Sequence, residues 1–264
     1  MKISIFTGNQ PRHLRLIERL SEICDEIVVV MECTTVFPGE VADFYKKSDT
    51  MKEYFGLVRA AEQKIFGRPR FLSGESKVMA IKDEDLSKLT MEDLAAVKGS
   101  DFHVVFGASF IKGPLLEYLV AHRALNIHMG VSPYYRGSSC NFWALYDGRP
   151  DMVGATVHLL SAGLDSGDML FHALPAPRSC EPMELGMYAV DSAQKGLVDS
   201  IKNGACLEFD PLPQDKSFEL RYSRHKEFDD EVARDFLNRG GKNLSIESCL
   251  AARDLDLFLK PHVS

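Results

Sequence analysis

Three short segments between residues 106 and 168 carry side chains that suit acyl transfer. They are Phe106–Ile111, Asn126–His128 and Gly163–Asp168, and they supply an amide, an imidazole and a carboxylate beside glycine-permitted turns. Amide and imidazole groups can donate hydrogen bonds to a developing oxyanion, and a carboxylate can pair with the imidazole. No Ser–His–Asp or Cys–His nucleophilic pair is evident, and Cys140 lacks the flanking pattern of a reactive thiol. The set therefore indicates acyl transfer without an enzyme nucleophile.

Asn126 and His128 belong to the apolar run 124–128, which predicts a strand. Residues two apart on a strand point to the same face of a sheet, so the amide and the imidazole can converge on one oxygen atom. An isolated pair of this kind would otherwise be read as a capping pair or a satisfied polar pair of the core. The other strand histidines are expected to be packed or surface residues: His103, His158 and His172.

The surrounding elements alternate between strands and helices, as apolar periodicity predicts. Strands are expected at 3–6, 26–31, 78–81, 102–106, 124–128, 152–160 and 169–174. Helices are expected at about 14–20, 40–66, 113–122, 139–146 and 181–203. This order predicts an α/β fold with a doubly wound, mostly parallel sheet. Ligands of such sheets bind beyond the carboxyl ends of strands, where Gly107 and His128 fall.

Asp210–Asp215 contains two prolines and predicts a linker. We therefore expect two parts, a catalytic domain over 1–209 and a small, partly helical C-terminal subdomain over 210–264. Two helices are expected in the second part, an amphipathic one containing Phe228, Val232 and Phe236 that ends at Gly240–Gly241, and a short one from Ile246 to Leu259. The amphipathic helix can pack on its own chain or form a homodimer.

Composition narrows the class of protein. The 264 residues carry a formal charge of −7, which argues against holding nucleic acid through a basic face. The start is too quickly polar for a secretory signal, and no apolar run is long enough for a membrane span, so a cytoplasmic protein is expected. The six cysteines are scattered without a C-x-x-C pair, which favours reduced thiols and no metal site.

Two runs, Ala124–Gly137 and Gly154–Gly167, resemble the catalytic core of the formyltransferase family. Its members include glycinamide ribonucleotide transformylase, methionyl-tRNA formyltransferase and sugar-nucleotide N-formyltransferases. The resemblance implies a Rossmann-like core that moves a formyl group from N10-formyltetrahydrofolate to an amine. It also implies that Asn126 is an oxyanion donor, His128 the polarising acid, and Asp165 its electrostatic partner and the relay for the amine proton. Asp168 is then expected to close the turn.

The same resemblance implies where the co-substrate and the acceptor bind. The pterin of the donor is expected against Ser109, Phe110, Ile111, Leu160 and Gly163, where backbone groups and apolar walls come together. The alternative for the 106–112 segment is a plain strand followed by a helix start. The acceptor is expected against Gly8, Asn9, Gln10, Tyr135 and Arg136. Alternatives are a simple connecting turn at residues 7–13 and structural anchoring by Arg136.

The acceptor is inferred by elimination among family members. The segment from Asp215 onward is short and nearly balanced in charge, which disfavours a tRNA acceptor, and it is longer than purine-pathway transformylases need. A nucleotide-linked amino sugar is therefore the expected acceptor. The alternatives are methionyl-tRNA or glycinamide ribonucleotide, hydrolysis of the same donor, and a non-catalytic folate-binding module.

Overall fold

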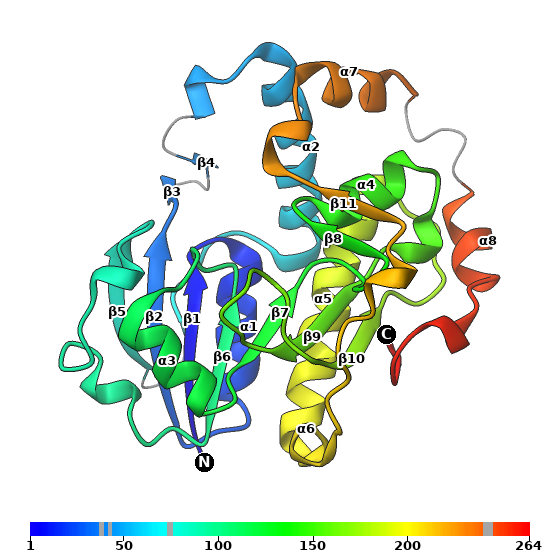
Figure 1. The fold of residues 1–264 in the computed structure, drawn as a ribbon. Helices are drawn as coiled ribbons and strands as arrows, with labels where there is room; N and C mark the ends of the chain where they lie inside the picture. Colours follow the sequence, from blue (N-terminus) through cyan, green and yellow to red (C-terminus); the bar gives the residue numbers. More distant parts are fainter. Residues whose placement is uncertain (37–39, 42–43, 73–75, 240–244) are drawn as a thin grey trace.

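The structure is a computed structural model that describes residues 1–36, 40–41, 44–72, 76–239 and 245–264. The described residues form an eight-stranded central sheet with helices on both faces (Figure 1). Within these residues, no helix combines the length and the apolar character that crossing a membrane requires.

The central sheet has the order β12-β10-β9-β7-β6-β1-β2-β5. Its strands are β1 (Lys2–Gly8), β2 (Glu26–Cys33), β5 (Ser76–Lys82), β6 (Phe102–Phe106), β7 (Leu125–His128), β9 (Ala155–Leu159), β10 (Met169–Leu174) and β12 (His262–Val263). The pairs from β7 through β5 are parallel, as is β10 with β12, whereas β9 runs antiparallel to both β7 and β10. The predicted α/β fold with a doubly wound, mostly parallel sheet is therefore confirmed.

Two small pairs of strands lie outside this sheet. They are β3 (Thr35–Val36) with β4 (Glu40–Val41), and β8 (Tyr135–Gly137) with β11 (Arg221–Ser223). The helices are α1 (Pro11–Ser21), α2 (Asp49–Phe66), α3 (Gly113–Ala121), α4 (Cys140–Tyr146), α5 (Pro182–Lys202), α6 (Ala205–Glu208), α7 (Asp230–Arg239) and α8 (Ile246–Ala251).

The sheet is buried on both faces because its strands are apolar on both sides. Ile3 and Ile5 pack with the apolar residues of α1 and α5 on one face. Phe6 and Val28 pack on the other face, with α3 and the short turns at 86–88 and 95–97. Each fully buried side chain of this size contributes about 2 kcal/mol. This two-sided burial stabilises the strands whose carboxyl ends carry the candidate site.

The hairpin between β9 and β10 carries the loop that contains Asp165. Its base is closed by Leu159, whose backbone N–H donates to the Asp168 carbonyl at 2.9 Å. Asp168 thus takes the expected position at the turn. A side chain at Gly167 would place its Cβ 1.7 Å from the Leu159 carbonyl oxygen, so only glycine permits this close approach.

Two predicted helices are shorter than expected. α2 begins at Asp49 and not at residue 40, because the Ser48 side chain caps it by accepting from the Met51 N–H at 3.1 Å. Residues 44–46 form a 3₁₀ turn and 40–41 a short strand, while residues 42–43 lie outside the described residues. α8 ends at Ala251, before Asp254 caps a separate 3₁₀ turn at 255–257.

The segment 210–264 packs on the rest of the chain. β11 pairs with β8, and β12 extends the central sheet beside β10. The Phe236 ring of α7 packs edge-on against Tyr54 of α2, so this amphipathic helix covers its own chain. α7 starts at Asp230, so Phe228 precedes it; its predicted end at Gly240–Gly241 lies outside the described residues.

Candidate active site

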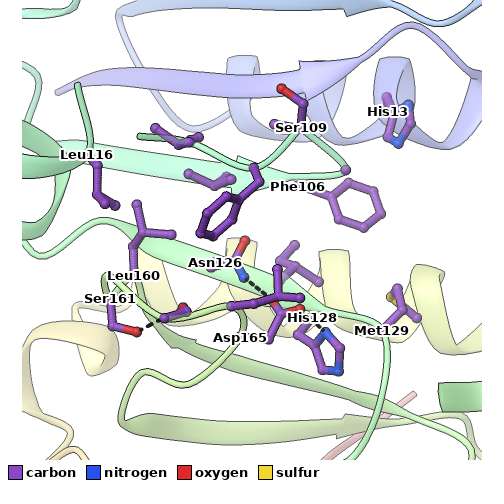
Figure 2. A pocket seen from close by; sticks show the side chains of 18 of the residues that line it. His13, Phe106, Ser109, Leu116, Asn126, His128, Met129, Leu160, Ser161 and Asp165 are labelled. Carbon is purple, nitrogen blue, oxygen red and sulfur yellow. Dashed lines mark hydrogen bonds and ion pairs between the residues drawn. The ribbon is translucent and has the colours of Figure 1, made fainter. Parts of the chain in front are cut away.

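A cavity of about 300 Å³ opens at the carboxyl ends of β6 and β7 (Figure 2). It lies between the turn after β6, the end of β7 and the loop after β9. The side chains and backbone that line it are Arg12, His13, Val105, Phe106, Gly107, Ala108, Ser109, Phe110, Ile111, Leu116, Asn126, Ile127, His128, Met129, Leu160, Ser161, Gly163, Leu164 and Asp165.

The three residues predicted to act together meet at one edge of this cavity. The Asn126 amide Nδ2 donates to Asp165 Oδ1 at 3.1 Å, and His128 Nδ1 lies 3.1 Å from Asp165 Oδ2. Asn126 and His128 are buried on β7, whereas about a quarter of the Asp165 side chain is exposed. Figure 2 shows both dashed contacts converging on the Asp165 carboxylate. The two donors therefore face one anionic group in the free protein.

His158 completes this arrangement from β9: it is packed, as expected, but its contact with the trio was not predicted. Its Nδ1 lies 2.8 Å from the Leu159 carbonyl, which can only accept, so Nδ1 carries the hydrogen. Its Nε2 then accepts from Asn126 Nδ2 at 2.9 Å. Both amide hydrogens of Asn126 are thus engaged, one by His158 and one by Asp165, which fixes the amide orientation. Asn126 and His158 are cross-strand partners in the β7–β9 pair.

Cys140 is a second residue whose position the sequence did not indicate. Its sulfur lies 3.5 Å from His128 Nε2, on the side of the ring opposite Asp165. Twelve positions separate the two residues, so neither strand nor helix periodicity connects them. Their contact depends on how the 129–139 segment folds back.

The electrostatics of the pair favour the charged forms of both members. Burial of the His128 ring acts to lower its pKa, but Cys140 and the Asp165 carboxylate outweigh it and raise the pKa from 6.5 to about 10. Burial acts to raise the pKa of Asp165, but the charge and the hydrogen bond of His128 hold it well below its ordinary value of 3.8. At neutral pH the pair is therefore an imidazolium and a carboxylate.

The residues predicted to hold the donor all line the cavity: Ser109, Phe110, Ile111, Leu160 and Gly163. Ile111 is buried and Phe110 is half exposed. The Ser109 backbone N–H and hydroxyl are both occupied by the Glu32 carboxylate, at 2.6 and 2.7 Å. Glu32 therefore fixes this turn in place, and the Ser109 donors are already used.

The residues predicted to hold the acceptor are not brought into this cavity. Asn9 Oδ1 accepts from Thr34 and Thr35 backbone N–H groups, and Gln10 caps α1. Tyr135 is buried, with its hydroxyl 3.3 Å from Asp147. Of the remaining two, Arg136 forms an ion pair with Glu219 at 3.0 Å, and Gly8 adjoins the His13 ring.

A second hollow adjoins the first through Arg12, which lines both. It brings together cationic, acidic, amide, aromatic and apolar side chains from the α1 start, from residues 41, 44 and 47, and from α2: Gln10, Arg12, Val41, Phe44, Lys47, Phe55, Val58, Arg59 and Glu62. Gln10 is the one predicted acceptor residue that lines it. Arg12 is paired with Glu62 at 2.9 Å, and Lys47 lies over the Phe55 ring.

His13, which the sequence did not single out, is buried against the cavity. Its ring packs edge-on to Phe106, and its Nδ1 accepts from the Gln10 N–H at 3.2 Å. Burial, followed by the charge of Arg12, lowers its pKa well below 6.5, so it is neutral. Two further histidines, on strands β6 and β10, are packed as expected: His103 contacts Ser4, and His172 contacts the Ser132 carbonyl.

The sheet order, the cavity at the strand ends and the Asn–His–Asp arrangement define a protein of the Rossmann-like formyltransferase fold. Residues 52–176, just under half of the chain, match the model of the formyl transferase family.

Solved structures share the fold. A 4-N formyltransferase from Francisella tularensis superposes with a TM-score of 0.53 at 15% identity, over 86% of this chain and 77% of that one. The formyltransferase PseJ from Anoxybacillus kamchatkensis superposes with a TM-score of 0.50 at 15% identity, over 95% and 97% of the two chains. That structure is a complex with UDP-4,6-dideoxy-4-formamido-L-AltNAc and tetrahydrofolate.

Sequence comparison finds relatives that are named for methionyl-tRNA, an acceptor different from the nucleotide sugar of the PseJ structure. A methionyl-tRNA formyltransferase of Synechococcus sp. (strain JA-3-3Ab) is 28% identical over 161 residues, which is 59% of this chain and 49% of the relative. The next such enzyme, from Cyanothece sp., matches over 38% of its own length. This chain thus spans about half or less of the curated relatives that it matches.

Proposed function

We propose that this protein transfers a formyl group from N10-formyltetrahydrofolate to the primary amine of a nucleotide-linked amino sugar. The observation that carries the proposal is the convergence of Asn126 and His128 on the Asp165 carboxylate at the edge of the cavity, with both contacts at 3.1 Å. A purely structural ion pair would not need an opening beside it.

The cavity suits the heterocyclic part of the donor. About 300 Å³ is at the lower end of the range for small-molecule sites. Phe106, Ile111 and Leu160 supply apolar walls for a flat ring system. Residues 107–111 line the same cavity, and their backbone groups, apart from the Ser109 N–H that Glu32 occupies, can meet the polar edge of a pterin. The bound folate would supply an activated formyl group, and the protein would supply the side chains that act on it.

The trio has three tasks in this reaction. The amine nitrogen forms a bond to the formyl carbon, the bond from that carbon to N10 breaks, and one amine proton is passed to N10. Negative charge develops on the formyl oxygen, and the Asn126 amide and the imidazolium of His128 can turn to that oxygen the hydrogens that face Asp165 in the free protein. The Asp165 carboxylate stabilises the imidazolium and accepts the proton of the attacking amine before it moves on.

The hollow beside Arg12 supports an anionic acceptor. Arg12, Lys47 and Arg59 line it together with the aromatic rings of Phe44 and Phe55, so the hollow holds three cationic groups against the one carboxylate of Glu62. Cationic groups suit a diphosphate, and aromatic faces suit a nucleobase. Because Arg12 lines both hollows, an acceptor seated here can extend its amine toward Asp165. The nucleotide-sugar ligand in the PseJ structure is consistent with this acceptor class.

The proposal is tested by measuring tetrahydrofolate release from N10-formyltetrahydrofolate under three conditions: no acceptor, a panel of UDP- and dTDP-linked amino sugars, and charged initiator methionyl-tRNA. We expect release that depends on one amino sugar. Release that depends on methionyl-tRNA, the substrate named for the sequence relatives, would overturn the acceptor but not the formyl transfer. Release without any acceptor would instead identify a hydrolase, and no release in any condition would favour a folate-binding module.

A further inference from the structure

Cys140 is buried behind the ring of His128. It is the first residue of α4, only 1% of its surface is exposed, and its sulfur lies 3.5 Å from His128 Nε2. The sulfur is also 3.4 Å from the carbonyl oxygen of Gly137. A sulfur–nitrogen separation of this size is a hydrogen-bond distance, because sulfur is larger than oxygen.

The neighbours of both groups determine which atom donates. The Gly137 carbonyl can only accept, so the Cys140 thiol donates its hydrogen there and leaves its lone pairs for His128. The Asp165 carboxylate can likewise only accept, so His128 Nδ1 carries a hydrogen. His128 Nε2 then donates to the sulfur. Both ring nitrogens are donors, which is the hydrogen-bonding pattern of an imidazolium.

The packing also fixes which edge of the ring faces the cavity. A Cβ at Gly130 would lie 2.9 Å from His128 Nε2 and 2.5 Å from the Cys140 Cβ, so these three groups are tightly packed together. Neither Gly130 nor Cys140 lines the cavity, whereas Asp165 does. Nε2 is therefore the rear nitrogen, and Nδ1 is the one directed toward the cavity edge.

We propose that Cys140 is a positioning residue for His128: its sulfur accepts the rear Nε2 hydrogen, which keeps the imidazole doubly protonated and its Nδ1–H directed at the cavity. This inference rests on the proposed function in that the cavity is where the formyl oxygen would bind. A buried imidazolium needs an acceptor for each N–H. Asp165 accepts the hydrogen of Nδ1, on the cavity side of the ring, and Cys140 accepts the hydrogen of Nε2, on the opposite side.

The ionisable groups that contact His128 come from three elements of the described chain. They are Asp165 from the loop after β9, His158 from β9 at 6.5 Å between ring centroids, and Cys140 from α4. Among these ionisable groups of the described residues, Cys140 is the one that lies beside the rear nitrogen. Removing its sulfur should therefore change the protonation of His128 without changing the Asp165 contact.

The test is to titrate His128 by ¹⁵N NMR of the imidazole nitrogens and to measure the pH dependence of kcat, in the wild-type chain and in Cys140→Ala and Cys140→Ser. Cys206→Ala is the matched control, because Cys206 is also a buried free thiol but packs in the main core away from the cavity. We expect Cys140→Ala to lower the midpoint of the His128 titration by about one pH unit. The alkaline limb of kcat should move with it, while the KM of the donor changes little.

Cys140→Ser should restore most of the midpoint, because a hydroxyl can still accept the Nε2 hydrogen, and Cys206→Ala should leave it unchanged. Equal midpoints in Cys140→Ala and the wild type would overturn the proposal. The wild-type spectrum provides a test that needs no variant: at neutral pH both His128 nitrogens should give the shifts of protonated nitrogens, and an unprotonated Nε2 would also refute it. The titration requires no turnover, so it stands or fails separately from the proposed activity.

Discussion

The side-chain amide of Gln214 donates to the main-chain carbonyls of both Asp165 and Gly167, at 2.8 and 2.9 Å. Asp165 has a φ of 44°, a left-handed conformation that costs an L-residue about 1–2 kcal/mol. Leu212 adds two backbone hydrogen bonds to Met169, at 2.8 and 2.9 Å. The segment that we expected to be only a linker thus holds the loop that points Asp165 at His128.

We expect Gln214→Ala to lower kcat by about tenfold, because a carboxylate that samples other loop conformations spends less time beside His128. The KM of the donor should change less, since Gln214 does not line the cavity. Steady-state kinetics would measure both, with Lys216→Ala, an exposed neighbour, as the control. An unchanged kcat in Gln214→Ala would show that the loop keeps its shape without this side chain.

Replacing Asp165 by Asn should lower kcat by about 10²–10⁴-fold, because the amide cannot accept the amine proton or pair with an imidazolium. Asp168→Asn is the matched control, since this carboxylate is exposed in the same loop and its backbone carbonyl closes the hairpin. Single-turnover formyl transfer would separate this chemical step from product release. Equal losses in the two variants would place the effect in the loop and not in the trio.

Stability should depend on pH through His128. The pKa of His128 is about 10 in the folded protein, against 6.5 for a histidine without these partners. The folded state therefore binds the proton more tightly than the unfolded state. This contribution is complete below about pH 6.5 and is lost as pH rises from 6.5 through about 10. Urea unfolding between pH 6 and 10 should show a steeper loss in the wild type than in His128→Asn. Parallel curves would contradict the assignment.

Gly167→Ala should destabilise the protein by about 1–3 kcal/mol, since its Cβ would collide with the Leu159 carbonyl and open the hairpin. Gly186→Ala is the contrasting substitution, because Gly186 lies inside α5 and nothing lies within 4 Å of an added Cβ. There alanine should stabilise the helix by about 0.5–1 kcal/mol. Chemical denaturation would give both values, and a neutral Gly167→Ala would show that the hairpin base can shift.

Much of the central sheet could be predicted because strand and helix periodicities are local. The Phe102–Phe106 strand and the Asn126–His128 spacing are examples, and both appear in the structure as expected. α2 was predicted nine residues too long at its start because the apolar spacing continued through residue 44, although Ser48 provided the capping signal. His158 could also have been found, since antiparallel pairing of 124–128 with 152–160 places it opposite Asn126.

The sequence by itself determined the alternation of strands and helices and the presence of an amide, an imidazole and a carboxylate, because these depend on neighbouring residues. Only the tertiary structure decided which groups surround the imidazole. Cys140 reaches the rear of His128 through a folded-back segment, and Gln214 reaches the Asp165 loop from 49 positions away. Such contacts depend on long-range packing of close-fitting side chains, which no local periodicity encodes.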